Sequence, residues 1–307
     1  MSLLLLLEQT LNGIQFGIFL FVISAGLTLV LGIMNVVNLA HGVLYMLGAY
    51  FAATFFKLTG SLLLALVLMM PSLLAVGILV EVIVLRRLYG RGHMDQVLAT
   101  FGLILFFNEI VRILWGVEAQ AMPIPEIVSG HVEILPGVPY PIFRLIIIGV
   151  GLAVAVLLYL LIAHTRIGML IRAGASDRAM VRALGVNIRL LYTAIFGLGA
   201  VLAGVAGLMA GPILSVESGM GDDMLILALV VIVIGGIGSI RGALVASIIV
   251  GVFEVVGRSF LPDLLLTILP SDFAETAGPA LSSMLIYILM VGVLFFKPTG
   301  LFPAKTG

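Results

Sequence analysis

The sequence contains no cysteine among its 307 residues, and only 10% of the residues are charged. The missing thiols exclude disulfide bonds, a thiol nucleophile and cysteine-bound metal sites. Lysine is also scarce, and none of Lys57, Lys297 and Lys305 follows a glycine, so the phosphate-binding motif G-x-x-x-x-G-K-[ST] is absent. We therefore expect the chain to hydrolyse no ATP by itself and to bind no cofactor of its own.

Positive and negative residues balance at 15 each, so there is no electrostatic case for binding nucleic acid. The four histidines are scattered and form no H-E-x-x-H motif, and we predict no metal site. Residues 219–222 match the G-x-G-D motif of intramembrane aspartyl proteases. However, no tyrosine is followed by aspartate, so the second carboxylate motif is missing. We assign no catalytic residue.

Apolar residues dominate what is present: 62% of the chain is hydrophobic and the mean hydropathy is +1.32. A membrane-spanning helix needs about 20 apolar residues, and uncharged runs of that length recur along the chain. The composition predicts an all-α, polytopic transmembrane helical bundle in the lipid bilayer. Residues 1–307 are expected to form a single transmembrane domain with about eight or nine spans.

The count of spans depends on the glycine-rich sequence GGIGSIRG. Its glycines, Gly235, Gly236, Gly238 and Gly242, form either a hairpin between two spans or a re-entrant segment, which gives eight spans. With nine, two spans fall within residues 9–56 and the others near 58–80, 96–115, 145–163, 190–211, 224–246, 247–261 and 277–296.

The loops between these runs separate by charge. Basic residues of one group of loops and the tail are Arg86, Arg87, Arg91, Arg166, Arg172, Arg178, Arg182, Arg189, Arg241, Lys297 and Lys305. Acidic residues of the other group are Glu118, Glu126, Glu133, Glu217, Asp222, Asp223, Asp263, Asp272 and Glu275. Lys and Arg are retained on the cytoplasmic side. This bias predicts an outer N-terminus and a cytoplasmic C-terminus.

A polar interruption lies within the first pair of expected spans. Asn35, Asn38 and His41 occur there together with Gly42 and other glycines. Non-helical backbone at membrane depth is tolerated only inside protein or beside water. The interruption is therefore a turn or a broken helix, whose polar side chains either line a pathway or satisfy the backbone that the break leaves unpaired.

The longest charged interval in the middle of the chain is residues 165–190, which holds five arginines and one acid. We predict a short helix over residues 176–185, with Ser176 as N-cap, Asp177 at the positive N-terminus and Gly185 as a left-handed end. One face is apolar and another is basic: Ala179, Met180, Ala183 and Leu184 form the first, Arg178 and Arg182 the second. The helix is either a docking element for a partner protein or part of an ordinary solvated loop.

Two acid–base pairs fall within expected spans, Glu109 with Arg112 and Glu254 with Arg258. Their spacings of three and four residues allow pairing along one helix. Ionisable residues inside a membrane are often functional. Each pair is either a neutralised structural pair or a part of a pathway.

Four separated segments, spread over nearly the whole chain, resemble bacterial branched-chain amino acid ABC permeases of the LivH branch. The matching residues are Asn38, Ala40, His41, Gly42, Met46, Gly48, Ala49 and Tyr50; Arg172, Ala173, Asp177, Ala183, Leu184, Gly185 and Asn187; Gly235, Gly236, Gly238 and Gly242; and the tail KPTGLFP. Leu39 replaces the more usual Phe and Lys297 the more usual Arg. The Glu-Ala-Ala-x-x-x-Gly motif of other importers is absent, so the docking assignment depends on this family's own variant.

The resemblance implies one membrane subunit of an ATP-driven importer in the bacterial inner membrane. The implied partners are a second related permease, two cytoplasmic ATPases that bind ATP and Mg, and a periplasmic binding protein. It also implies that the 165–190 segment contacts the ATPases, through Arg172, Asp177, Arg178, Ala179, Met180, Ala183, Leu184 and Gly185. Two alternatives remain: a secondary transporter or channel for a small polar solute, and an ABC permease for urea or short amides.

Overall fold

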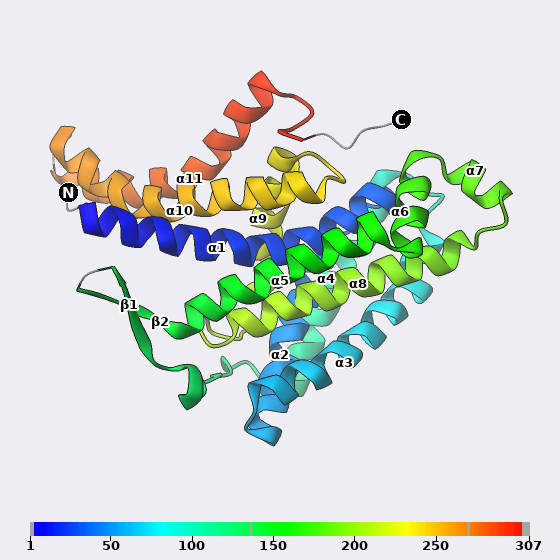
Figure 1. Ribbon diagram of the computed structural model, residues 1–307, viewed down its shortest axis with the longest axis horizontal. Helices are drawn as coiled ribbons and strands as arrows, with labels where there is room; N and C mark the ends of the chain where they lie inside the picture. The colour runs from blue at the N-terminus through cyan, green and yellow to red at the C-terminus, as the bar shows by residue number, and fades with distance from the viewer. Residues whose placement is uncertain (1–2, 136, 269–270, 303–307) are drawn as a thin grey trace.

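The computed structural model describes residues 3–135, 137–268 and 271–302 (Figure 1). The elements, in chain order, are α1 (Leu3–Leu29), η1 (Val30–Met34), α2 (His41–Thr59), α3 (Leu62–Ile83), η2 (Leu85–Arg87), α4 (His93–Trp115), η3 (Glu126–Val128), β1 (His131–Leu135), β2 (Val138–Pro141), α5 (Ile142–His164), α6 (Arg166–Ser176), α7 (Arg178–Ala183), α8 (Ile188–Ala210), α9 (Met220–Gly235), α10 (Ile240–Ile268) and α11 (Ser271–Phe296). The side chains of Arg178, Ala179, Asp272 and Glu275, and the whole of Lys305, lie outside the described part of the chain.

Within the described residues, eight helices are long and apolar enough to cross a membrane. They are α1 with η1, α2, α3 with η2, α4, α5, α8, α10 and α11. This agrees with the predicted polytopic helical bundle. The expected break at residue 246 was wrong, because α10 runs without interruption from Ile240 to Ile268. The hairpin of β1 and β2, which pair antiparallel, was not foreseen.

Helices α1, α2 and α8 form the buried centre of the bundle. Small residues let these helices approach their neighbours backbone to backbone. A Cβ built on Gly17 of α1 would lie 2.6 Å from the carbonyl oxygen of Ser247 in α10. In α8, Gly207 packs against the backbone of Tyr45 in α2. In a bilayer the lipid tails contact apolar side chains as favourably as a neighbouring helix does. Close packing of this kind is therefore a main source of helix association there.

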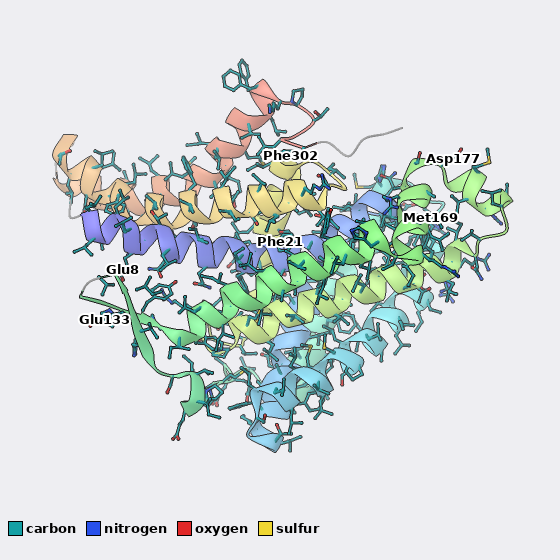
Figure 2. All side chains as sticks on the ribbon, in the orientation of Figure 1. Glu8, Phe21, Glu133, Met169, Asp177 and Phe302 are labelled. Atoms are coloured by element: carbon teal, nitrogen blue, oxygen red, sulfur yellow. The ribbon has the colours of Figure 1, made fainter. Side chains whose placement is uncertain are left out.

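The two ends of the bundle differ in charge and structure. We call the end that carries η2, α6 and α7 the arginine end, and the opposite end, with β1 and β2, the hairpin end. Glu8 and Glu133 both lie at the hairpin end, and Asp177 lies at the arginine end (Figure 2). The tail is placed near the arginine end by hydrogen bonds from the amides of Leu301 and Phe302 to α9.

Helix α9 begins inside the bundle. The amide of Gly219 lies 3.4 Å from Sδ of Met46, and Oγ of Ser218 bonds the carbonyl of Asn108 at 3.5 Å. At 1.5 Å per residue, Met46 is roughly 20 Å and Asn108 roughly 10 Å from the hairpin ends of α2 and α4. The apolar layer of a bilayer is about 30 Å thick. Residues 211–219 therefore descend to mid-depth before α9 begins, so that only the second part of this crossing is helical; we call this crossing the half-span.

This half-span resolves the ambiguity in the count of spans. The glycine-rich sequence forms the turn between α9 and α10, with Gly236 at φ 101° and Gly238 at φ 81°. The unusual crossing is the segment before it, residues 211–235, which enters at the hairpin end and leaves at the arginine end. Residues 222 and 223, expected in a loop beyond the membrane, instead form the first turn of α9. With eight full spans and one half-span, Leu3 and Phe302, the first and last described residues, lie at opposite ends.

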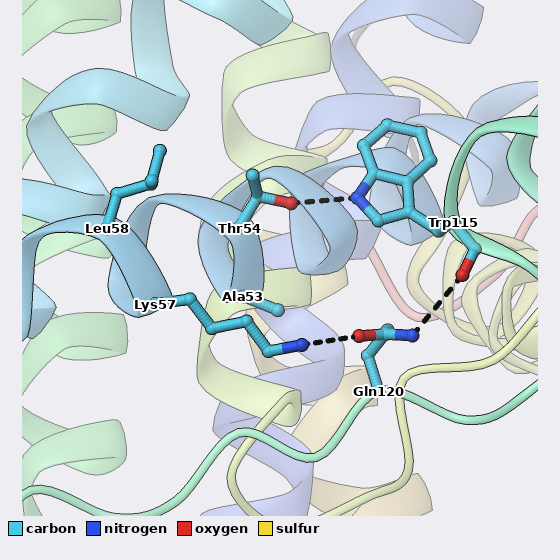
Figure 3. Close-up of a pocket in the computed structure, with 6 residues that line it drawn as sticks. All are labelled: Ala53, Thr54, Lys57, Leu58, Trp115 and Gln120. Carbon is cyan, nitrogen blue, oxygen red and sulfur yellow. Dashed lines mark hydrogen bonds between the residues drawn. The ribbon is translucent and has the colours of Figure 1, made fainter.

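A series of hydrogen bonds fixes the start of the loop between α4 and β1 at the hairpin end (Figure 3). Lys57 donates to Oε1 of Gln120 at 2.7 Å, and Nε2 of Gln120 donates to the carbonyl of Trp115 at 3.4 Å. The indole of Trp115 donates to Oγ1 of Thr54 at 2.8 Å. These residues surround a pocket of about 230 Å³. The contacts hold residues 115–120 against the end of α2.

Candidate functional site

The break between α1 and α2 follows from three local features. The last turn of α1 widens into the π-helix η1, and Asn35 then takes a left-handed conformation with φ 52°. Asparagine tolerates this conformation better than most residues. The amide of Val37 donates to Oε1 of Gln96 at the start of α4, 3.1 Å away. The predicted broken helix is thus a π turn, a left-handed residue and a short extended link.

Asn38 and His41 are buried, whereas Asn35 is exposed. Oδ1 of Asn38 accepts a hydrogen bond from the amide of Ala40 at 3.1 Å. Nε2 of His41 donates to the carbonyl of Ile23 in α1 at 3.0 Å. Oδ1 of Asn38 thus satisfies the backbone of the break, whereas Ile23 lies inside α1, and Nδ2 of Asn38 and Nδ1 of His41 are buried without a hydrogen-bond partner among the described residues. Both readings of this site stay open. The pathway role of these residues stays a prediction.

Glycines make the contacts that set the depth of this break. A Cβ on Gly42 would collide with the carbonyl of Gly221 at the start of α9. At the other end of α9, Gly235 packs against the backbone of Gly242, and the positive φ angles of Gly236 and Gly238 turn the chain. The four glycines of GGIGSIRG thus build a tight turn at the arginine end.

The charged segment forms two helices, α6 and α7. Ser176 is the last residue of α6, so its predicted role as N-cap was wrong. Asp177 takes that role: its backbone is extended and its Oδ1 accepts from the amide of Met180 at 2.9 Å. A carboxylate at this position also interacts favourably with the helix dipole. The left-handed end at Gly185 is confirmed by its φ of 84°.

The outer face of α7 is apolar and uncovered. Met180 is 58% exposed and Leu184 is 75% exposed, while Val181 packs inward and is buried. Ala183 is exposed beside them. Arg172 differs from the other predicted contact residues, because it lies on α6 and its guanidinium donates to the carbonyl of Ile162 at the end of α5. Arg172 therefore ties α6 to α5 and lies outside the α7 face.

A buried carboxylate at the arginine end was missed in the sequence. Glu81 is fully buried near the end of α3. Arg86 donates to both of its oxygens, at 3.2 and 2.8 Å, and Thr193 of α8 donates to Oε2 at 2.8 Å. Tyr89 donates to Oε1 at 2.5 Å. Burial, together with this hydrogen bond, raises the pKa of Tyr89, so the phenol stays protonated. We call these four residues the Glu81 cluster.

The two acid–base pairs predicted within spans both form, but in different surroundings. Arg112 and Glu109 pair at 2.9 Å, and both side chains are exposed on α4. Arg258 also pairs with Glu254 on α10, but Glu254 is only 6% exposed. Because exposed pairs contribute little to stability and buried charges are costly, only the second pair requires a further explanation.

Comparison with known proteins places this architecture in a family. Residues 9–294 match the family model described as branched-chain amino acid transport system, permease component. The chain is 30% identical to the high-affinity branched-chain amino acid transport system permease protein BraD of Pseudomonas aeruginosa, over 96% of this chain and 95% of that protein. It is 27% identical to LivH of Escherichia coli K12, over 94% and 95% of the two chains.

A third relative comes from an archaeon. The probable branched-chain amino acid transport permease protein LivH of Methanocaldococcus jannaschii is 27% identical over 94% of this chain and 90% of that protein. No solved structure matches the chain. The family match and the relatives cover nearly every element of the fold, from α1 to α11. The chain therefore belongs to the family of branched-chain amino acid transport system permease components.

Proposed function

We propose that this chain is one of two membrane subunits of an ATP-driven importer for branched-chain amino acids in a bacterial inner membrane. The observation that carries the proposal is the match of residues 9–294 to the permease family. The names of the relatives, BraD and LivH, support the substrate class. The sequence lacks a phosphate-binding motif, so ATP and Mg bind to two partner ATPases. A second related permease and a periplasmic binding protein complete the assembly.

The geometry of the arginine end supports a mechanism of coupling. The apolar face of α7 docks in a groove on an ATPase subunit, as amphipathic helices do on many partners. Four residues after α7 the chain enters α8, which lies at the centre of the bundle. When ATP brings the ATPases together, α7 moves, and α8 carries the movement to the pathway between the two permeases. The pathway then alternates its opening between the two sides.

The proposal is tested by transport. The chain is purified with its second permease and two ATPases, reconstituted into liposomes, and given the binding protein loaded with radioactive leucine. We expect leucine uptake that requires ATP and the binding protein. A Walker-motif variant of the ATPases serves as the control and abolishes uptake without changing the assembly. Uptake that continues without ATPases would instead support a secondary transporter or channel, and uptake of urea in place of leucine would change the substrate class.

We also propose that the arginine end faces the cytoplasm, because Lys and Arg are retained there. Gly90, Ala175 and Ser129 are exposed, the first two at the arginine end and the third at the hairpin end. The chain has no cysteine, so single substitutions give no background from the permease itself. In whole cells, Ser129→Cys is expected to react with a membrane-impermeant thiol reagent, whereas Gly90→Cys and Ala175→Cys react only after lysis. Reaction of Ala175→Cys in intact cells would reverse the orientation.

A further inference from the structure

A half-open groove of about 570 Å³ lies between α1, α9, α10 and α11. Sites for small ligands commonly have about 300–1,000 Å³. Three charged residues line the groove, Asp223, Glu254 and Arg258, and most of its remaining wall is apolar. Because Asp223 lies in the first turn of α9, the groove opens at the mid-depth at which this helix begins. We call it the α9–α11 groove.

The buried carboxylate of Glu254 is only half satisfied. One of its oxygens accepts from Arg258, and Oε2 is buried and has no hydrogen-bond partner among the described residues. An unpaired buried acceptor is destabilising, and more so when it is charged. The costly arrangement persists beside a groove large enough for a ligand. A donor from that ligand would satisfy Oε2.

The other charges of the groove complement this acceptor. The side chain of Arg258 is 65% exposed, and only one of its nitrogens bonds Glu254, so other N–H groups remain directed to the groove or solvent. Asp223 is exposed on the part of the wall that α9 forms. Two acids and one base give the groove a negative balance, which favours a ligand that carries a cationic donor. The apolar wall includes Met224, Leu227 and Ile286.

We propose that the α9–α11 groove is a transport site for a zwitterionic amino acid with an aliphatic side chain. The substrate ammonium donates to Oε2 of Glu254 and to Asp223, the substrate carboxylate accepts from Arg258, and the aliphatic chain lies on the apolar wall. The second permease closes the open side of the groove during transport. This inference rests on the proposed function and deepens it, because urea and short amides can donate N–H groups to Oε2 but have neither an ammonium to balance the two acids nor a carboxylate to accept from Arg258.

Occupancy is tested by protection of an introduced thiol. Ser283 lines the groove and is exposed, and the chain has no other thiol. In the assembled transporter, we expect Ser283→Cys to react with a charged methanethiosulfonate reagent, and leucine at saturating concentration to slow the reaction at least about fivefold. The matched control is Ser129→Cys at the hairpin end, whose rate leucine leaves unchanged. The reactions are run without nucleotide and with the ATPases trapped by ATP.

Each other outcome overturns the inference. A thiol at Ser283 that stays unreactive in both nucleotide states would mean that lipid or the second permease fills the groove. Equal protection by leucine, lysine and urea would exclude recognition of a zwitterion with an aliphatic side chain. Protection of the Ser129 control would show that leucine alters the reagent or the whole assembly.

The charges are tested by uptake in the reconstituted importer. Glu254→Gln is expected to lower leucine uptake about tenfold or more, because a charged hydrogen bond of about 1.5–3 kcal/mol is lost. Glu109→Gln, in the exposed pair on α4, is the matched control and keeps full uptake. The charge swap Glu254→Arg with Arg258→Glu restores an ion pair. Recovery of uptake in the swap would show a structural pair and contradict the transport site.

Failure of this site can be told apart from failure of the proposed function. If the unaltered importer shows no ATP-driven uptake, the proposed function is wrong. If it transports leucine and Glu254→Gln transports equally well, the proposed function stands and the α9–α11 groove is not the transport site.

Discussion

Replacing Met180 and Leu184 together with aspartate is expected to release the ATPase subunits while the permease stays inserted and abundant. Both side chains are exposed on α7, so the change leaves the bundle itself intact. Burial of one such side chain stabilises an interface by about 1.5–3 kcal/mol. Loss of two weakens binding by roughly 100-fold or more. A pull-down in detergent measures the association, and substrate-stimulated ATP hydrolysis is expected to disappear with it.

Two control variants give this experiment its specificity. The exchange Met180→Leu with Leu184→Met keeps both side chains apolar and is expected to keep the ATPases bound. Ile127→Asp alters an exposed apolar residue at the hairpin end and is expected to have no effect on the pull-down. A normal pull-down with the double aspartate variant would move the docking site to residues 85–93, the other basic loop at the arginine end.

The second large effect is expected from Gly42→Leu. A side chain at Gly42 meets the carbonyl of Gly221, and backbone atoms cannot rotate away as a side chain does. Overpacking costs about 1–3 kcal/mol where side chains adjust, and a backbone collision costs at least that much. We expect loss of assembly or of transport, and a lower unfolding temperature. The single tryptophan, Trp115, reports unfolding by its fluorescence.

The matched control is Gly102→Leu in α4, because no atom lies within 4 Å of a Cβ built there. This variant is expected to unfold at the temperature of the unaltered protein. Gly42→Ala is expected to lie between the two. Normal assembly, stability and transport in Gly42→Leu would show that α2 and α9 separate at this contact, and would remove it as the element that sets the depth of α9. If His41→Ala also transports normally, the break has no pathway role.

The sequence predicted the helical bundle and the position of α7 because both depend on local patterns. Apolar runs identify spans, and the spacing of Met180 and Leu184 identifies one face of a short helix. The wrong N-cap arose because Ser176 and Asp177 are both good caps. Helix α6 begins at Arg166, is capped by Thr165, and extends as far as Ser176. Ser176 is therefore helical, and Asp177 becomes the cap of α7.

Features that depend on distant contacts could not be predicted. The run of residues 224–235 is uncharged and apolar, so its hydropathy carries no information on where α9 starts. The contact of Gly42 with Gly221 decides that depth. Glu81 lies close in the sequence to Arg86 and Arg87, so nothing there distinguishes it from an exposed loop residue. Its burial is completed by Thr193, which lies 112 positions later in the chain. Pairings at such a separation leave no pattern in a single sequence.

The Glu81 cluster ties three elements of the arginine end together. Its carboxylate binds η2 through Arg86 and α8 through Thr193, while α3 carries the carboxylate itself. Under the proposed coupling, a force applied at α7 is therefore expected to turn α3 and α8 together. The buried charge thus predicts which helices move as one unit.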